Sequence, residues 1–148
     1  MIMSATLWLK IGAIWGFLAV SMGAFGAHGL QERFQSLGAL SAGRPAEYYE
    51  ARFHTAAQYH MYCALAILVV GLVTATGRGG MALQVSGWSF LLGSLIFSGT
   101  LYALSTTGHR WLGAITPIGG LLMLVGWIAL AMAAGVPSNP MAPSIESR

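Results

Sequence analysis

The sequence predicts an all-α fold, an integral membrane four-helix bundle, and three observations support that prediction. Hydrophobic residues make up 56% of the chain, whereas charged residues make up only 7%. Soluble domains carry about 25% charged residues, so this chain has too few charges to cover a surface that faces water. Four apolar stretches also follow one another, each close to the roughly 20 residues that cross about 30 Å of hydrocarbon.

The four predicted spans cover residues 7–27, 55–76, 81–104 and 112–134, and together with their connections they form one domain over residues 1–134. The first span contains one charge, Lys10, and the third and fourth contain none. We expect the second helix to begin near Pro45, because proline suits the first position of a helix, and Glu47 and Glu50 follow in its first turns. The tail over residues 135–148 contains three prolines and is predicted to be disordered.

Small residues recur at helical spacing in three of the predicted spans. Without bulky side chains in the way, the backbones of two membrane helices approach closely and gain dispersion contacts. We therefore expect these residues to mark the packed faces of the bundle rather than the wall of a channel. The packing residues predicted in this way are Gly12, Gly16, Gly23, Ser94, Gly119 and Gly126.

The second predicted helix carries unusual polarity into its apolar stretch. His60 and Cys63 are three residues apart on one helical face, a spacing that lets an imidazole and a thiolate reach one metal ion. His28, at the end of the first span, is the third candidate ligand, because the first two spans are expected to be antiparallel neighbours. The alternative is that His60 forms a hydrogen bond across the bundle and Cys63 packs as a small hydrophobe.

Several motifs together resemble a known family. They are GAFGAHGL at residues 23–30, TAAQYHMY at 55–62, FSGTLY at 97–102 and TPIGG at 116–120. In combination they resemble the YgdD-like family of small membrane proteins, found in bacteria and, as a related transmembrane protein, in organisms with mitochondria. The resemblance implies four spans in the bacterial inner membrane and brings no activity, substrate or cofactor. Position 63 is usually histidine in that family, so Cys63 is a departure. The motif positions that carry over as candidate functional residues are His28, Tyr59, His60, Ser98, Tyr102, Thr116 and Pro117.

The sequence favours a non-catalytic membrane component that binds lipids, other membrane proteins or a second copy of itself. It has no nucleophile elbow, Walker loop or HExxH motif, which weakens an enzymatic interpretation. Its scattered net charge of +3 offers no basic patch for nucleic acid. Two alternatives remain open, with the cofactor unknown. One is a carrier or channel for an ion, a proton or a metal that uses the His/Cys cluster, and the other is an accessory protein that binds a quinone or haem.

Overall fold

The computed structural model describes residues 3–40, 44–77 and 80–134, and every element within these ranges is a helix. The predicted disordered tail, residues 135–148, lies outside the described residues. The elements are α1 (Ala5–Gly29), α2 (Gln31–Leu40), α3 (Ala46–Ala75), α4 (Met81–Thr107) and α5 (Leu112–Ala134). α3 begins directly after Pro45, which occupies the N-cap position. Four of these helices, all but α2, are long and apolar enough to cross a membrane, so the predicted all-α membrane fold is confirmed.

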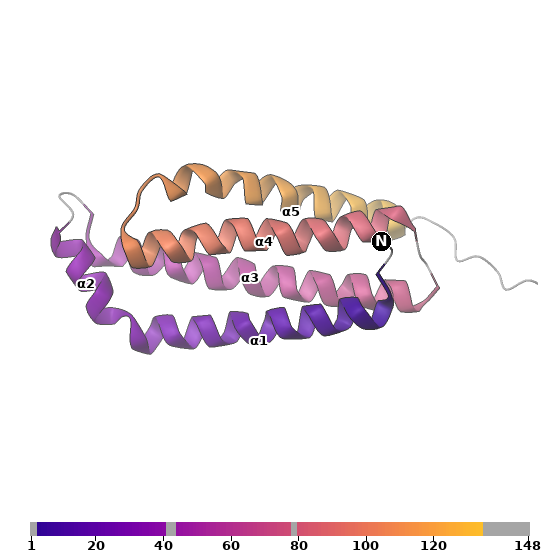
Figure 1. Cartoon of the computed structure of the whole chain (residues 1–148), viewed down its shortest axis with the longest axis horizontal. Coiled ribbons are helices and arrows are strands. Elements are labelled where there is room, and N and C mark those ends of the chain that lie inside the picture. Colours follow the sequence, from indigo (N-terminus) through magenta and orange to yellow (C-terminus); the bar gives the residue numbers. More distant parts are fainter. Residues whose placement is uncertain (1–2, 41–43, 78–79, 135–148) are drawn as a thin grey trace, which may run out of the picture.

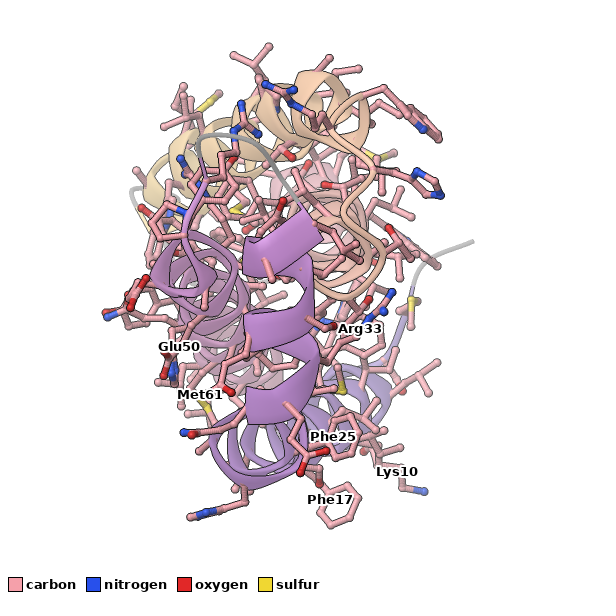
Figure 2. The ribbon with its side chains drawn as sticks, turned by 90° about the vertical axis from the view of Figure 1, so that its left-hand side faces the viewer. Lys10, Phe17, Phe25, Arg33, Glu50 and Met61 are labelled. Carbon is pink, nitrogen blue, oxygen red and sulfur yellow. The ribbon has the colours of Figure 1, made fainter. Side chains whose placement is uncertain are left out.

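The long helices lie side by side in the order α1, α3, α4, α5 (Figure 1). The central pair is the most enclosed, since 44% of the apolar window of α3 and 50% of that of α4 are buried. The corresponding values are only 17% for α1 and 28% for α5, the two outer helices. The outer surface of α1 carries large apolar side chains such as Phe17 and Phe25, which point away from the bundle (Figure 2). Such a surface needs hydrocarbon as its solvent.

Glycines set the distances between neighbouring helices. Gly12, Gly16 and Gly23 of α1 all face α3; a Cβ atom on Gly16 would lie 3.8 Å from the Ala64 Cβ. The seam between α4 and α5 is tighter, because a Cβ on Gly119 would lie 2.5 Å from the backbone nitrogen of Phe97. Close backbone approach of this kind supplies the dispersion contacts that hold membrane helices together.

The short helix α2 lies across one end of the bundle, roughly perpendicular to the long helices (Figures 1 and 2). It buries Phe34 and Leu37 against an aromatic cluster that includes Phe53 of α3. The side chain of Arg33 points from α2 toward α4, where its Nε donates a hydrogen bond to the carbonyl of Thr106 at 2.8 Å. This bond satisfies one of the carbonyls that the end of α4 leaves without a helical partner. α2 therefore fixes the end of the bundle at which α1 and α4 finish.

Candidate functional site

Two cavities lie on opposite faces of the central α3–α4 pair. The first, which we call the cleft, has a volume of about 250 Å³ and is bounded by α1, α3 and α4. The second, which we call the groove, has a volume of about 760 Å³ and is bounded by α3, α4 and α5. The candidate residues divide between them: His60, Ser94, Ser98 and Tyr102 line the cleft, and Tyr59, Cys63 and Pro117 line the groove.

The accessible wall of the cleft is almost entirely apolar, but two polar atoms are buried behind it. His60 is 7% exposed and Ser98 is 2% exposed, and both side chains line the cavity. The hydroxyl of Tyr102 lies 3.5 Å from His60 Nδ1, at the long limit of a hydrogen bond. Within the part of the chain that the structure describes, His60 Nε2 and Ser98 Oγ have no hydrogen-bond partner. Unpaired polar atoms at this depth are costly, so this wall is the most unusual feature of the interior.

Trp15 of α1 closes one side of the cleft. Its ring meets His60 edge-on, with the ring centroids 5.1 Å apart. Its Nε1 donates a hydrogen bond of 2.8 Å to Ser94 Oγ, and Ser94 in turn donates to the carbonyl of Leu91. The backbones of α1 and α4 do not pack closely, so the long indole side chain connects the two helices. The space that remains between them is the cleft.

The groove is almost entirely apolar. Cys63 and Ala66 lie on its α3 side and are 3% exposed each, whereas Leu65 is 52% exposed. Leu121 and Leu124 of α5 form the other side and are exposed as well. The groove therefore opens toward the hydrocarbon along its length. Nothing in its wall resembles a catalytic or metal-binding arrangement.

One end of the groove becomes polar where α3 leaves the apolar region. A cavity of about 340 Å³ there shares Phe97 and Pro117 with the groove and is also lined by Arg52 and Thr116. The Thr116 hydroxyl pairs with that of Thr100 at 2.9 Å. We call this region the arginine end.

Two guanidinium groups gather at the arginine end around one aromatic ring. Arg52 lies 5.0 Å and Arg44 lies 4.7 Å from the centroid of the Tyr48 ring. The ion pair found among the described residues joins His54 to Glu50, so neither arginine has a carboxylate partner there. Stacking on an aromatic face orients a guanidinium group, and Arg44 Nη1 also donates a hydrogen bond of 3.3 Å to the Tyr48 hydroxyl.

The predicted metal ligands are not brought together. His28 is exposed at the end of α1, beyond the level at which Gly26 meets Phe53, and is thus roughly two helical turns from His60. His60 and Cys63 share a helix but line different cavities. No group of three His, Cys, Asp or Glu side chains among the described residues could hold a metal ion. His60 and Cys63 lie one turn apart on α3, but α1 places Trp15 rather than His28 beside His60.

Comparison with known proteins assigns the chain to a family. A family described as "Protein of unknown function (DUF423)" matches residues 22–120, which include most of the lining of both cavities. The chain belongs to this family. It is 41% identical to the UPF0382 membrane protein YwdK of Bacillus subtilis (strain 168) over 124 residues, or 84% of this chain and 92% of that protein. It is 39% identical to the UPF0382 membrane protein SAB0533 of Staphylococcus aureus (strain bovine RF122 / ET3-1), over 86% of this chain and 93% of the relative.

Membership of the DUF423 family confirms the predicted resemblance to small bacterial membrane proteins of unknown function. The relatives are membrane proteins, and the four spans make this chain a multi-pass protein of the plasma membrane, with the lipid bilayer around it. No solved structure matches the chain. Trp15 lies outside the matched range, although His60, Ser98 and Tyr102 lie within it.

Proposed function

We propose that this protein is a non-catalytic membrane component that binds one anionic phospholipid in the groove. The observation that carries the proposal is the position of Arg52, which lines the polar end of a long apolar groove and shares the Tyr48 ring with Arg44. Neither arginine has a carboxylate partner among the described residues. A phospholipid has the same layout, with a charged phosphate at one end and acyl chains at the other. Its phosphate accepts hydrogen bonds from guanidinium groups, and an acyl chain replaces bulk lipid in the groove.

The depth of the arginine end supports this arrangement. Arg52 precedes the apolar stretch of α3, which begins near Thr55, so its guanidinium lies at the level of lipid headgroups. The groove runs from there along α5 as far as Trp127, well inside the hydrocarbon. A headgroup at Arg52 and an acyl chain beside Leu121 and Leu124 therefore keep their normal depths in the bilayer.

Lipid binding by the purified protein tests the charge requirement. We would titrate the detergent-solubilised protein with phosphatidylglycerol and with phosphatidylcholine and measure both dissociation constants by native mass spectrometry. Each arginine near an anionic lipid surface contributes about 1 kcal/mol, so Arg52→Gln should weaken phosphatidylglycerol binding about fivefold. Lys10→Gln removes the same charge from α1, away from both cavities, and should have no effect. Equal affinity for the two lipids in the unaltered protein would contradict the proposal.

A second pair of variants tests whether the lipid binds in the groove. A Cβ on Gly120 would lie 3.9 Å from the Phe97 ring, at ordinary contact distance, so Gly120→Leu adds a side chain to the lining of the groove. Gly99 lines the cleft with nothing within 4 Å of an added Cβ, and Gly99→Leu is the matched control. Gly120→Leu should reduce phosphatidylglycerol binding while Gly99→Leu leaves it unchanged. The reverse result would place the lipid elsewhere.

A further inference from the structure

We propose that the arginine end selects an anionic phospholipid whose headgroup carries free hydroxyl groups, as the headgroup of phosphatidylglycerol does. This inference rests on the lipid proposed for the groove and specifies its headgroup. It starts from the hydrogen-bonding groups that line the cavity at the arginine end, where, unlike in the cleft, much of the accessible wall is polar. These groups are of two kinds, donors and acceptors, and each kind requires a different part of a headgroup.

The donors of the arginine end suit a phosphate. Arg52 and Tyr48 both line the cavity, and the Arg52 guanidinium carries a positive charge and a fork of N–H donors. The Tyr48 hydroxyl accepts a hydrogen bond from Arg44 Nη1, so it keeps its own proton for another acceptor. A phosphodiester is an anion with acceptor oxygens and no donor of its own, so it pairs with these groups. Donors alone, however, would bind any anionic phospholipid equally well.

The first acceptor is a backbone carbonyl of α5. Pro117 lies inside this helix and has no N–H, so the carbonyl of Gly113, four residues earlier, loses its partner within the helix. The carbonyl of a helical residue points toward the residues three and four positions later. Gly113, Thr116 and Pro117 all line the cavity, so this carbonyl lies on the face of α5 that forms the wall. Gly113 is partly exposed and, without a side chain, presents only its backbone to the cavity.

The second acceptor is the hydroxyl of Thr55 on α3. This side chain lines the cavity and is partly exposed, but it donates its proton to the carbonyl of Ala51 at 2.9 Å. The Thr116 hydroxyl uses its proton in the same way, on the carbonyl of Leu112 or on the Thr100 hydroxyl. A hydroxyl that donates within the fold has only acceptor capacity left for a ligand. These oxygens therefore cannot serve a phosphate and instead require a donor.

The combination of donors and acceptors distinguishes headgroups from one another. A glycerol headgroup extends hydroxyl groups beyond the phosphate, which can donate to the Gly113 carbonyl and to Thr55 while the phosphate stays at Arg52. An ethanolamine headgroup also has N–H donors, but its ammonium would lie near the guanidinium groups of Arg44 and Arg52, and like charges repel. The cavity volume of about 340 Å³ lies within the roughly 300–1,000 Å³ of small-molecule sites. A phosphoglycerol group therefore matches the cavity in charge, in hydrogen bonding and in size.

Native mass spectrometry with lipids of identical acyl chains tests the inference. Phosphatidylmethanol carries the same charge as phosphatidylglycerol but has no hydroxyl group in its headgroup. The unaltered protein should bind phosphatidylglycerol about tenfold more tightly than phosphatidylmethanol, because two hydrogen bonds contribute roughly threefold each. It should bind phosphatidylmethanol more tightly than phosphatidylcholine, because the guanidinium charge attracts any anionic lipid. Arg52→Gln should weaken the binding of both anionic lipids by the same factor and leave their ratio unchanged.

Two variants test the acceptors. Pro117→Ala supplies the missing N–H, so the Gly113 carbonyl gains a helical partner and the preference for phosphatidylglycerol over phosphatidylmethanol should fall to about threefold. Thr55→Val should lower it equally, and the double variant should abolish it. Any general change in groove packing affects both lipids and cancels in the ratio. Thr74→Val removes a hydroxyl with the same bond to its own helix, away from the cavities, and should leave the preference at tenfold.

The outcomes separate this inference from the lipid proposal. Equal affinity for phosphatidylglycerol and phosphatidylmethanol, with both tighter than phosphatidylcholine, would overturn the selection of hydroxyl groups and leave the lipid proposal standing. Equal affinity for all of these lipids would overturn both. An undiminished preference in both Pro117→Ala and Thr55→Val would contradict the assignment of the acceptors. Pro117→Ala adds a backbone hydrogen bond to α5 and Thr55 is partly exposed, so both variants should fold.

Discussion

The cleft and the groove flank the same pair of helices but differ in size and in the polar groups beside them. The groove is about three times larger. The accessible walls of both cavities are mostly apolar, and apolar surface facing hydrocarbon costs no free energy. The unpaired polar atoms of His60 and Ser98 are buried behind the wall of the cleft and are not exposed in it. The groove offers polar groups to a ligand only at its arginine end.

The helix seams beside the two cavities differ in which atoms meet. At Gly16 the α1–α3 seam has ordinary contact with Ala64, although a Cβ on Gly12 would lie 3.0 Å from the Leu68 nitrogen. α1 meets α4 through the indole side chains of Trp8 and Trp15. α4 and α5 approach more closely, backbone to backbone, at Gly93 and Gly119. Long side chains therefore connect α1 to α4, whereas close backbone packing joins α4 to α5.

The largest effect should come from adding a methyl group to the tighter seam. A Cβ on Gly119 would lie 2.5 Å from the Phe97 nitrogen and 2.7 Å from the Gly93 carbonyl oxygen, and neither backbone can move alone. Gly119→Ala should lower the free energy of unfolding by about 2 kcal/mol, as overpacking does in other interiors. Unfolding in mixed detergent and SDS micelles would measure it. Gly16→Ala is the matched control and should be neutral; equal losses would mean that the seams do not differ.

A smaller effect should come from the bond that spans the cleft. Trp15→Phe removes the indole donor to Ser94, and a double-mutant cycle with Ser94→Ala isolates that bond. Side-chain hydrogen bonds between membrane helices contribute about 0.6 kcal/mol on average, with a maximum near 1.7 kcal/mol, and we expect a coupling energy in this range. The same unfolding measurement applies. A cycle of Trp15→Phe with Ser98→Ala should show no coupling, and coupling there would mean that Trp15 rearranges.

The sequence predicted the helices well because hydrocarbon imposes their length. Apolar runs of the required length located all four spans, and Pro45 indicated the beginning of α3. The sequence indicates only a short amphipathic turn at residues 30–37, whereas the structure has the ten-residue helix α2 over Gln31–Leu40. α2 has only ten residues and is stabilised by Phe34 and Leu37 packing against the bundle, contacts that a single-sequence pattern does not contain.

The arrangement of the helices, and hence the site, was harder to predict. Membrane helices are apolar on every side, so hydrophobic periodicity does not show which face meets which neighbour. His60, Ser98 and Tyr102 were found because they are polar or belong to the family motifs. Trp15 was not identified, because the sequence alone does not distinguish a tryptophan that contacts another helix from one that faces lipid. The helical pattern places Arg52 on the same face of its helix as Tyr59, His60 and Cys63, but its relation to the groove depends on the position of α5.

The smallest effect on stability should distinguish Ser86, which is hydrogen-bonded across the α4–α5 seam, from Ser98, which is buried without a partner among the described residues. Ser86 Oγ donates to the carbonyl of Gly126 at 2.9 Å across the α4–α5 seam, so Ser86→Ala should cost about 0.6 kcal/mol in the same unfolding assay. Ser98 Oγ is buried without a partner among the described residues, so Ser98→Ala should cost nothing or stabilise the protein slightly. If Ser98→Ala is instead as destabilising as Ser86→Ala, Ser98 is already paired within the fold.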